Sequence, residues 1–226
     1  MITLHAIGKS FDGESGKIDV LNNLSLRVEK SEFVSLLGRS GEGKSTLLNI
    51  LGGFDQFDSG SYQFDEMEIS ELNSSQLTDF RMCNIGFVFQ SFHLIKHLTI
   101  RKNVELPLLL RKVSESERKQ RALAMLERLN IADKADCYPR QLSGGQCQRV
   151  AIARALVGKP GLILADEPTG ALDRETADSI LDLFKQLNSE GHTIIMVTHD
   201  PAVAQKAHKA FELTQGKLVR KVYEKH

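Results

Sequence analysis

The chain has 226 residues, of which 41% are hydrophobic and 26% are charged, proportions typical of a globular protein and unlike those of a disordered one. Its 29 Lys and Arg residues balance its 29 Asp and Glu residues, so the net charge provides no general attraction to nucleic acid or to anionic lipid. The 3 cysteines form no CxxC pair, no apolar run approaches the ~18 residues of a membrane span, and no signal peptide is evident, so we expect a soluble intracellular protein.

The first half of the chain shows short strands around a glycine-rich segment. Alternating or continuous apolar residues predict strands over 2–6, 20–28, 33–37 and 85–89. A turn is expected over 12–16, between the first two strands. The apolar stretch after the glycine-rich segment 38–45 predicts a helix that ends at Gly52 and Gly53.

The second half alternates between helices and buried strands. The pattern predicts helices over 114–129, 145–157 and 174–188, strands over 162–165 and 193–197, and a hairpin around 215–216. Pro107 predicts that no long helix crosses 91–110. We therefore expect an α/β fold with a mostly parallel sheet, N-terminal antiparallel strands and a site at the carboxyl ends of the parallel strands. The strand-free stretch 91–158 predicts a helical insert.

The segment 38–45, GRSGEGKS, matches the pattern G-x-x-x-x-G-K-[ST] and lies between a predicted strand and a predicted helix. Its three glycines allow backbone N–H groups to approach a polyphosphate closely, and the following helix N-terminus adds positive partial charge. Lys44 can reach the β- and γ-phosphates, and the Ser45 hydroxyl can ligate Mg²⁺. The segment predicts a nucleotide-phosphate site, and the alternative is a glycine-rich turn with a chance lysine.

Two further segments point to the same chemistry. Asp166 and Glu167 follow an apolar strand, where Asp166 can hold Mg²⁺ and Glu167 can polarise a water as general base; alone, the pair would be read as a solvated turn. The segment 142–146, LSGGQ, opens a helix with a serine and two glycines, which predicts a second anion site. Its alternative is a simple capping box, because Ser143 and Gln146 have the required spacing.

Together these segments resemble the ATP-binding cassette (ABC) ATPases over residues ~4–216. Gly38–Ser45 matches the Walker A motif, 142–146 the family signature and 162–167 Walker B; Gln90 matches the glutamine loop, 170–173 the D-loop and His199 the switch histidine. The segments DEPTGALD, FQSFHLIKHLT and Glu105-Leu106-Pro107 resemble those of the lipoprotein-release and macrolide-export type of ABC ATPase.

The resemblance implies ATP and Mg²⁺ as ligands and a role for each matching residue. The ATP-binding residues would be Phe11, which stacks on adenine, with Gly38, Arg39, Ser40, Gly41, Glu42, Gly43, Lys44, Ser45, Thr46, Ser143, Gly144, Gly145 and Gln146. The catalytic residues would be Glu167, His199 and Gln90, and the metal ligands Ser45, Gln90 and Asp166.

The family also implies an architecture and partners. The chain would be one ABC ATPase domain, with a catalytic core at 1–90 and 159–226 and a helical subdomain at 91–158. Two copies would form a head-to-tail homodimer that drives a separate transmembrane permease from the cytoplasmic face of the cell membrane, with no nucleic acid partner. The alternative is a non-transport ABC ATPase in DNA repair, chromosome maintenance or translation. Only 99 positions separate Lys44 from Ser143, without extended heptads, and the chain has one cassette, so we favour transport.

Three details lead to narrower hypotheses. Glu42 places an acid in the phosphate loop, which requires its side chain to point away from the phosphates. Cys147, in the first turn of the signature helix, could be a reactive thiol because helix N-termini lower thiol pKa values; the alternative is a buried and inert cysteine. The apolar residues Phe92, Leu94, Ile95 and Leu98 could form a groove for a permease helix, or could pack the core of the insert.

Overall fold

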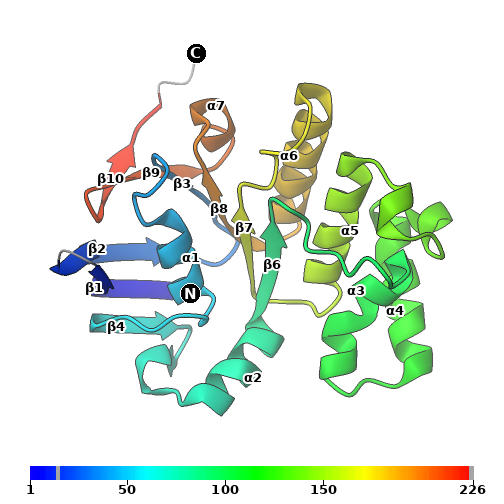
Figure 1. The fold of residues 1–226 in the computed structure, drawn as a ribbon, viewed down its shortest axis with the longest axis horizontal. Coiled ribbons are helices and arrows are strands. Elements are labelled where there is room, and N and C mark those ends of the chain that lie inside the picture. Colours follow the sequence, from blue (N-terminus) through cyan, green and yellow to red (C-terminus); the bar gives the residue numbers. More distant parts are fainter. Residues whose placement is uncertain (14–15, 224–226) are drawn as a thin grey trace.

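The computed structural model describes residues 1–13 and 16–223, which form an antiparallel sheet, a second and mostly parallel sheet, and helices around the second (Figure 1). The antiparallel sheet has the order β2-β1-β4-β5. Its strands are β1 (Ile2–Gly13), β2 (Gly16–Val28), β4 (Ser59–Phe64) and β5 (Met67–Glu68). The turn predicted at 12–16 falls partly on residues 14–15, which lie outside the described residues.

The second sheet has six strands in the order β10-β9-β3-β8-β7-β6, and every neighbouring pair except β10 and β9 is parallel. The strands are β3 (Phe33–Leu37), β6 (Ile85–Phe89), β7 (Leu162–Asp166), β8 (Thr193–Thr198), β9 (Lys209–Thr214) and β10 (Lys217–Lys221). This arrangement confirms the predicted α/β class with its mostly parallel sheet and N-terminal antiparallel strands.

The helices cover both faces of the six-stranded sheet. They are α1 (Lys44–Leu51), α2 (Ser74–Asn84), α3 (Ile100–Leu110), α4 (Glu115–Arg128), α5 (Gly144–Leu156), α6 (Arg174–Ser189) and α7 (Pro201–Ala204), with 3₁₀ turns at Ile69–Glu71, Ala132–Lys134 and Pro139–Gln141. Among the helices of the described residues, none has both the length and the apolar character needed to cross a bilayer.

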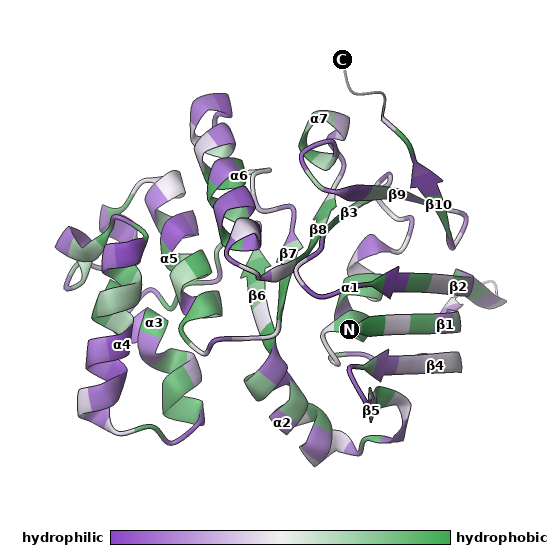
Figure 2. Ribbon diagram, turned by 180° about the vertical axis from the view of Figure 1, so that it is seen from behind, coloured by the Kyte–Doolittle hydropathy of each residue, from purple (hydrophilic) through white to green (hydrophobic). Residues whose placement is uncertain are grey.

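Alternation along the central strands divides the apolar interior into two cores. Val34, Leu164 and Val197 face one core, which the antiparallel sheet and α1 complete. Ile163 and Met196 face the opposite core, to which α3, α4, α5 and α6 contribute. In Figure 2 the central strands are mostly green, whereas α6 alternates between purple and green because only one of its faces is buried. A parallel sheet that is covered on both faces has this pattern.

Helix α3 differs from the sequence prediction, because Pro107 lies inside it instead of ending it. The Thr99 side chain caps the helix, and Ile100, Val104 and Leu108 are completely buried on one face. Pro107 removes one helical hydrogen bond, and the burial of this face outweighs that loss. Sequence reasoning also gave no prediction for β4, β5 and α2.

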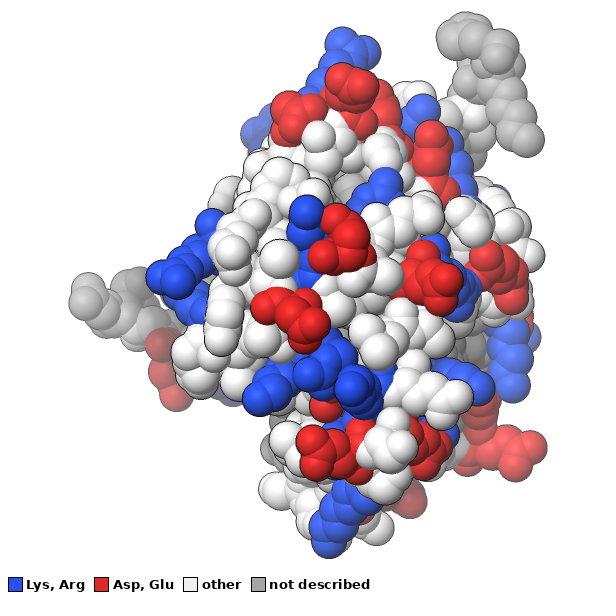
Figure 3. Space-filling model, turned by 90° about the vertical axis from the view of Figure 1, so that its right-hand side faces the viewer, with Lys and Arg blue, Asp and Glu red and all other residues white. Residues whose placement is uncertain are grey.

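The outer surface carries charges of both signs. On the face shown in Figure 3, Lys and Arg side chains alternate with Asp and Glu side chains and with uncharged residues. Some of these charges pair on the helices, as Arg121 does with Glu117 and Lys185 with Asp182. Exposed pairs of this kind add little stability, so the apolar cores provide most of it.

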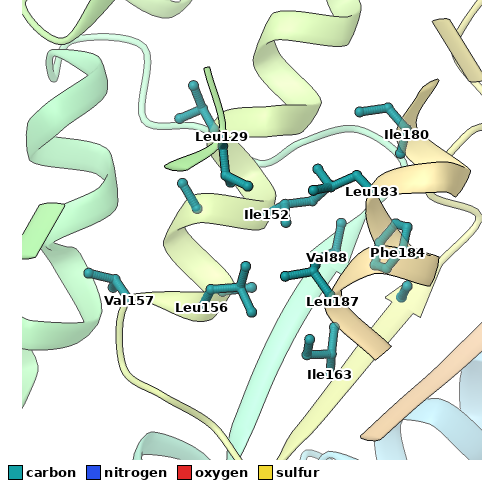
Figure 4. Close-up of a cluster of buried hydrophobic side chains, with 14 of the residues drawn as sticks. Val88, Leu129, Ile152, Leu156, Val157, Ile163, Ile180, Leu183, Phe184 and Leu187 are labelled. Carbon is teal, nitrogen blue, oxygen red and sulfur yellow. The ribbon is translucent and has the colours of Figure 1, made fainter. Parts of the chain in front are cut away.

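Phe184 tests the importance of the second core. Its side chain is completely buried on α6 among residues of α5, β6 and β7 (Figure 4). We expect Phe184→Ala to lower the free energy of unfolding by about 3–5 kcal/mol, since it removes a large side chain and leaves a cavity. Urea unfolding followed by circular dichroism measures this change. The exposed neighbour Gln186→Ala should change it by no more than about 0.5 kcal/mol, and a similar small loss for Phe184→Ala would contradict this account of the core.

Candidate functional site

Four parallel strands deliver the predicted site residues to one edge of the sheet. In the ladder Leu37 pairs with Thr198, Val197 with Asp166, and Asp166 with Phe89, so all four strands end within one position of one another. The chain then enters the phosphate loop after β3, His199 after β8, Glu167 after β7 and Gln90 after β6. Parallel pairing therefore brings together residues as far apart as Leu37 and Thr198, which are 161 positions apart.

A cavity of about 1060 Å³ opens at this edge. Predicted site residues that line it are Phe11, Gly38, Arg39, Ser40, Gly41, Gly43, Lys44, Ser45, Thr46, Gln90, Asp166, Glu167 and His199. Four residues that sequence reasoning missed also line it: Val20, Leu37, Pro201 and Glu212. Leu37 and Pro201 adjoin predicted segments, whereas nothing local in the sequence marks Val20 or Glu212.

The phosphate loop has a backbone that only glycine adopts easily. Gly41 and Gly43 have φ values of 85° and 92°, and a Cβ on Gly43 would lie 2.7 Å from the Val20 Cγ1 atom. Gly43 also precedes α1 without any side-chain cap, which leaves the first N–H groups of the helix available to an anion. The loop is thus shaped for an anionic ligand.

Lys44 lies within the loop, mostly buried. Its Nζ donates to the backbone oxygens of Gly38 at 2.8 Å and Arg39 at 2.7 Å. These neutral acceptors hold the ammonium group beside the cavity, where phosphate oxygens would be stronger acceptors for a cation.

The two carboxylates after β7 have different surroundings. Burial raises the pKa of Asp166 and the nearby Glu167 charge raises it further, whereas Lys44 opposes this shift. The two Glu167 oxygens each lie 2.9 Å from Nδ1 of His199. A hydrogen bond to a carboxylate requires Nδ1 to carry the proton, so His199 holds Glu167 by donating to it. Glu167 also adopts a φ of 47°, a strained value for a residue with a Cβ.

Gln90 and Phe11 both line the cavity. A Cβ added to Gly170 would lie 2.9 Å from Gln90 Nε2, which places the amide against the turn after Glu167. Phe11 is 42% exposed, and the Lys9 ammonium lies 4.9 Å from the centroid of its ring. Lys9 in turn contacts Asp55 at 3.1 Å, so the ring has a fixed support and one open face.

The signature segment lies apart from this cavity. Ser143, Gly144, Gly145 and Gln146 are not among the described residues that line it. Ser143 and Gln146 form the capping box, since each side chain accepts a hydrogen bond from the other residue's backbone N–H. Ser143 and Gly144 are exposed, so one chain presents the first turn of α5 to solvent.

Glu42 points away from the cavity, as its place in a phosphate loop requires. Its Oε2 accepts a hydrogen bond of 2.9 Å from the backbone N–H of Gln215, in the turn between β9 and β10. Glu42 is outside the set of described residues that line the cavity. The acid therefore links the loop to a neighbouring hairpin.

The hypothesis of a reactive Cys147 is wrong. Only 8% of Cys147 is exposed, and its Sγ lies 3.7 Å from the Pro139 carbonyl oxygen. Burial raises the pKa of this thiol, because desolvation of the thiolate outweighs any effect of the helix N-terminus.

A separate groove of about 310 Å³ lies beside β6. The residues expected to form a groove, Phe92, Leu94, Ile95 and Leu98, are not among the described residues that line it. Its walls include Met82, Phe87, Phe89, His93 and Pro107. Leu94 instead packs against the core of the helices, and the Phe92 ring would lie 3.8 Å from a Cβ on Gly144 of the signature turn.

Comparison with known proteins places these features in context. The model of the family described as ABC transporter matches residues 21–170. The chain is 48% identical over 219 residues to the uncharacterized ABC transporter ATP-binding protein YvrO of Bacillus subtilis (strain 168), which covers 97% of this chain and 96% of that protein. It is 45% identical to the macrolide export ATP-binding/permease protein MacB 1/2 of Paracoccus denitrificans (strain Pd 1222), over 97% of this chain and 33% of that protein.

A solved structure shows the same fold. The dimeric post-hydrolysis state of the ATP-binding cassette MJ0796, bound to ADP and Pi, has a TM-score of 0.89 and 42% identity, with 98% of each chain covered. Relatives that are named as transporter components favour transport over chromosome maintenance, repair or translation. The chain spans about a third of the length of the macrolide-export relative.

Thiol labelling tests the correction at Cys147. We expect a maleimide to modify Cys83, which is exposed, at least about 10-fold faster than Cys147, whose thiol is buried and has a raised pKa. Peptide mass spectrometry over a time course measures both rates, with Cys147→Ser as the control for peak assignment. Equal rates at the two cysteines would restore the reactive-thiol hypothesis.

Proposed function

Because this chain belongs to the ABC transporter family and is an ATP-binding and ATP-hydrolysing transporter component, we propose that two copies close around two ATP molecules to drive a membrane permease. In this proposal each site combines the phosphate loop of one copy with the signature turn of the other. The observation that carries it is the separation of the two anion-binding turns: the cavity contains the phosphate loop, whereas Ser143 and Gly144 are exposed elsewhere on the chain. The MJ0796 cassette, whose solved structure is a dimer bound to ADP and Pi, supports a dimer of this chain.

The residues at the cavity suit ATP. The ring of Phe11 offers an open face for a base, and Lys44 and the uncapped start of α1 offer donors for the phosphates. We propose that the γ-phosphate gives His199 a new acceptor, which releases the oxygens of Glu167. Glu167 can then accept the proton of an attacking water as general base.

The same edge suits Mg²⁺. Ser45, Gln90 and Asp166 all line the cavity and offer hydroxyl, amide and carboxylate oxygens, the ligand atoms that this ion prefers. Bound Mg²⁺ would neutralise phosphate charge. Asp166 would then remain ionised despite its burial, because a cation opposes the effect that raises its pKa.

A permease on a separate chain would dock at the groove beside β6, which places this ATPase at the cytoplasmic face of the cell membrane. The groove joins the end of β6, which leads to Gln90, with helices of the predicted helical subdomain 91–158. Met82, Phe87 and Pro107 give it an apolar floor suited to a short amphipathic helix. The relative named as an ATP-binding/permease protein supports a membrane partner.

Glu167→Gln tests the catalytic assignment. We expect ATP binding to persist and turnover to fall by about 10²–10⁴-fold, because the amide cannot accept the proton of the attacking water. Single-turnover hydrolysis and equilibrium ATP binding separate the two effects. The variant should also accumulate as an ATP-bound dimer in size-exclusion chromatography, and hydrolysis near the wild-type rate would exclude Glu167 as the base.

Met82→Glu tests the groove. A charge in the apolar floor should reduce permease-stimulated ATPase activity by about 10-fold or more, because docking would have to desolvate it. Basal ATPase activity of the isolated chain should remain unchanged. The matched control is Cys83→Glu, one position along α2 and exposed, outside the described lining of the groove. Equal stimulation of both variants by the permease would place the docking surface elsewhere.

A further inference from the structure

Gln148 is a completely buried amide at the start of the signature helix α5. Its Nε2 donates a hydrogen bond of 2.8 Å to the backbone oxygen of Pro168. Its Oε1 has no hydrogen-bond partner among the described residues. A buried amide that is only partly satisfied is less favourable than a hydrocarbon of similar size, so core packing alone does not account for it.

The hydrogen bond of Gln148 joins two turns with different chemistry. Pro168 directly follows Glu167, and Gln148 lies five positions after Ser143. The signature turn also packs against the chain that follows the Glu167 turn, since a Cβ on Gly145 would lie 2.4 Å from Thr176 Cγ2, at the start of α6. A Cβ on Gly144 would lie 3.2 Å from Leu172, in the segment between Glu167 and α6.

The rest of α5 is held in other ways. Ile152 and Leu156 pack in the core against α6, β6 and β7 (Figure 4). Arg149 donates to the Ser179 hydroxyl at 2.8 Å, and Arg154 donates to the Phe92 backbone oxygen at 2.7 Å. Gln148 is the member of this helix whose side chain bonds to the turn that carries Glu167.

In the proposed dimer, on which this inference rests, Glu167 serves the ATP of its own chain and Ser143 serves the ATP of the partner chain. We propose that Gln148 is a positioning residue that fixes these two turns relative to each other, so that each chain sets both composite sites together. A hydrogen bond from a buried, fixed amide holds the Pro168 carbonyl in distance and direction, which apolar contact does not do. A change in the Glu167 turn is thereby transmitted to the signature turn of the same chain.

Mixed dimers test this proposal. Subunits with different affinity tags are combined so that one carries Lys44→Ala, which leaves a single working phosphate loop in the dimer. In the first arrangement Gln148→Met is in the subunit that carries Lys44→Ala. That subunit contributes only its signature turn to the working site, so the substitution can affect the site only through Ser143. In the second it is in the other subunit, and it acts through Glu167.

We expect kcat to fall by about 10-fold in both arrangements with KM for ATP within about twofold, since displacement of reacting groups by about 1 Å lowers rates strongly. A loss in only one arrangement, or in neither, would overturn the link. The ATPase activities of the wild-type dimer and of the dimer with Lys44→Ala alone test the proposed function before Gln148 is changed. A failure of the proposed function is therefore seen separately from a failure of the Gln148 proposal.

Asn188→Leu is the matched control. Asn188 is also a buried helix amide, and its Nδ2 donates to the backbone oxygens of Ser31 and His192, away from the cavity. Both variants should lower the midpoint of thermal unfolding, but only Gln148→Met should lower kcat. Equal kcat values would reduce Gln148 to a structural role and overturn the proposal. Gln148→Leu replaces Gln148→Met in the same design if circular dichroism shows that the latter does not fold.

Discussion

The site depends on the register of four parallel strands. Phe89, Asp166 and Thr198 end their strands within one position of the level at which Leu37 ends β3, and each following residue enters the cavity edge. A slip of one position would turn every side chain of a strand to the opposite face. Since both faces of this sheet are buried, such a slip would exchange side chains between the two apolar cores and disrupt the close packing of each. The apolar cores therefore fix the geometry of groups that belong to neither.

The edge of the sheet also holds Glu167, the proposed general base, in an unfavourable backbone conformation. Glu167 keeps a left-handed backbone, which costs about 1–3 kcal/mol, between two backbone hydrogen bonds. Its N–H donates to the Val197 oxygen at 3.0 Å, and its own oxygen accepts from Gly170 at 3.0 Å. The strained turn directs the Glu167 carboxylate toward His199 and the Pro168 carbonyl toward Gln148. One short turn thus serves both the catalytic edge and the signature helix.

Sequence reasoning found the elements in which the signal is local. The apolar runs at 33–37 and 85–89 match β3 and β6 at both ends, because strands of a parallel sheet covered on both faces are mostly apolar. It made no prediction for β4, whose residues SGSYQF are mostly polar. These residues form a strand because they pair with β1. It found the site residues that follow strands, but not the contacts between distant segments. Glu42 with Gln215 is separated by 173 positions and His199 with Glu167 by 32, so only the fold brings them together.

The signature turn shows why two interpretations of one sequence pattern need not compete. LSGGQ could be a capping box or an anion site, and the capping box is present in the structure. The Ser143 hydroxyl uses one of its lone pairs to accept from the Gln146 N–H, and a hydroxyl also has one proton to donate. The N–H groups of Gly144 and Gly145 occupy the first turn of α5, where no helical carbonyl can pair with them. The cap therefore orients the serine and fixes the start of the helix, while the donors that an incoming phosphate needs stay free. Capping keeps the exposed turn in order within a single chain, and that order prepares the turn for the nucleotide of a second one.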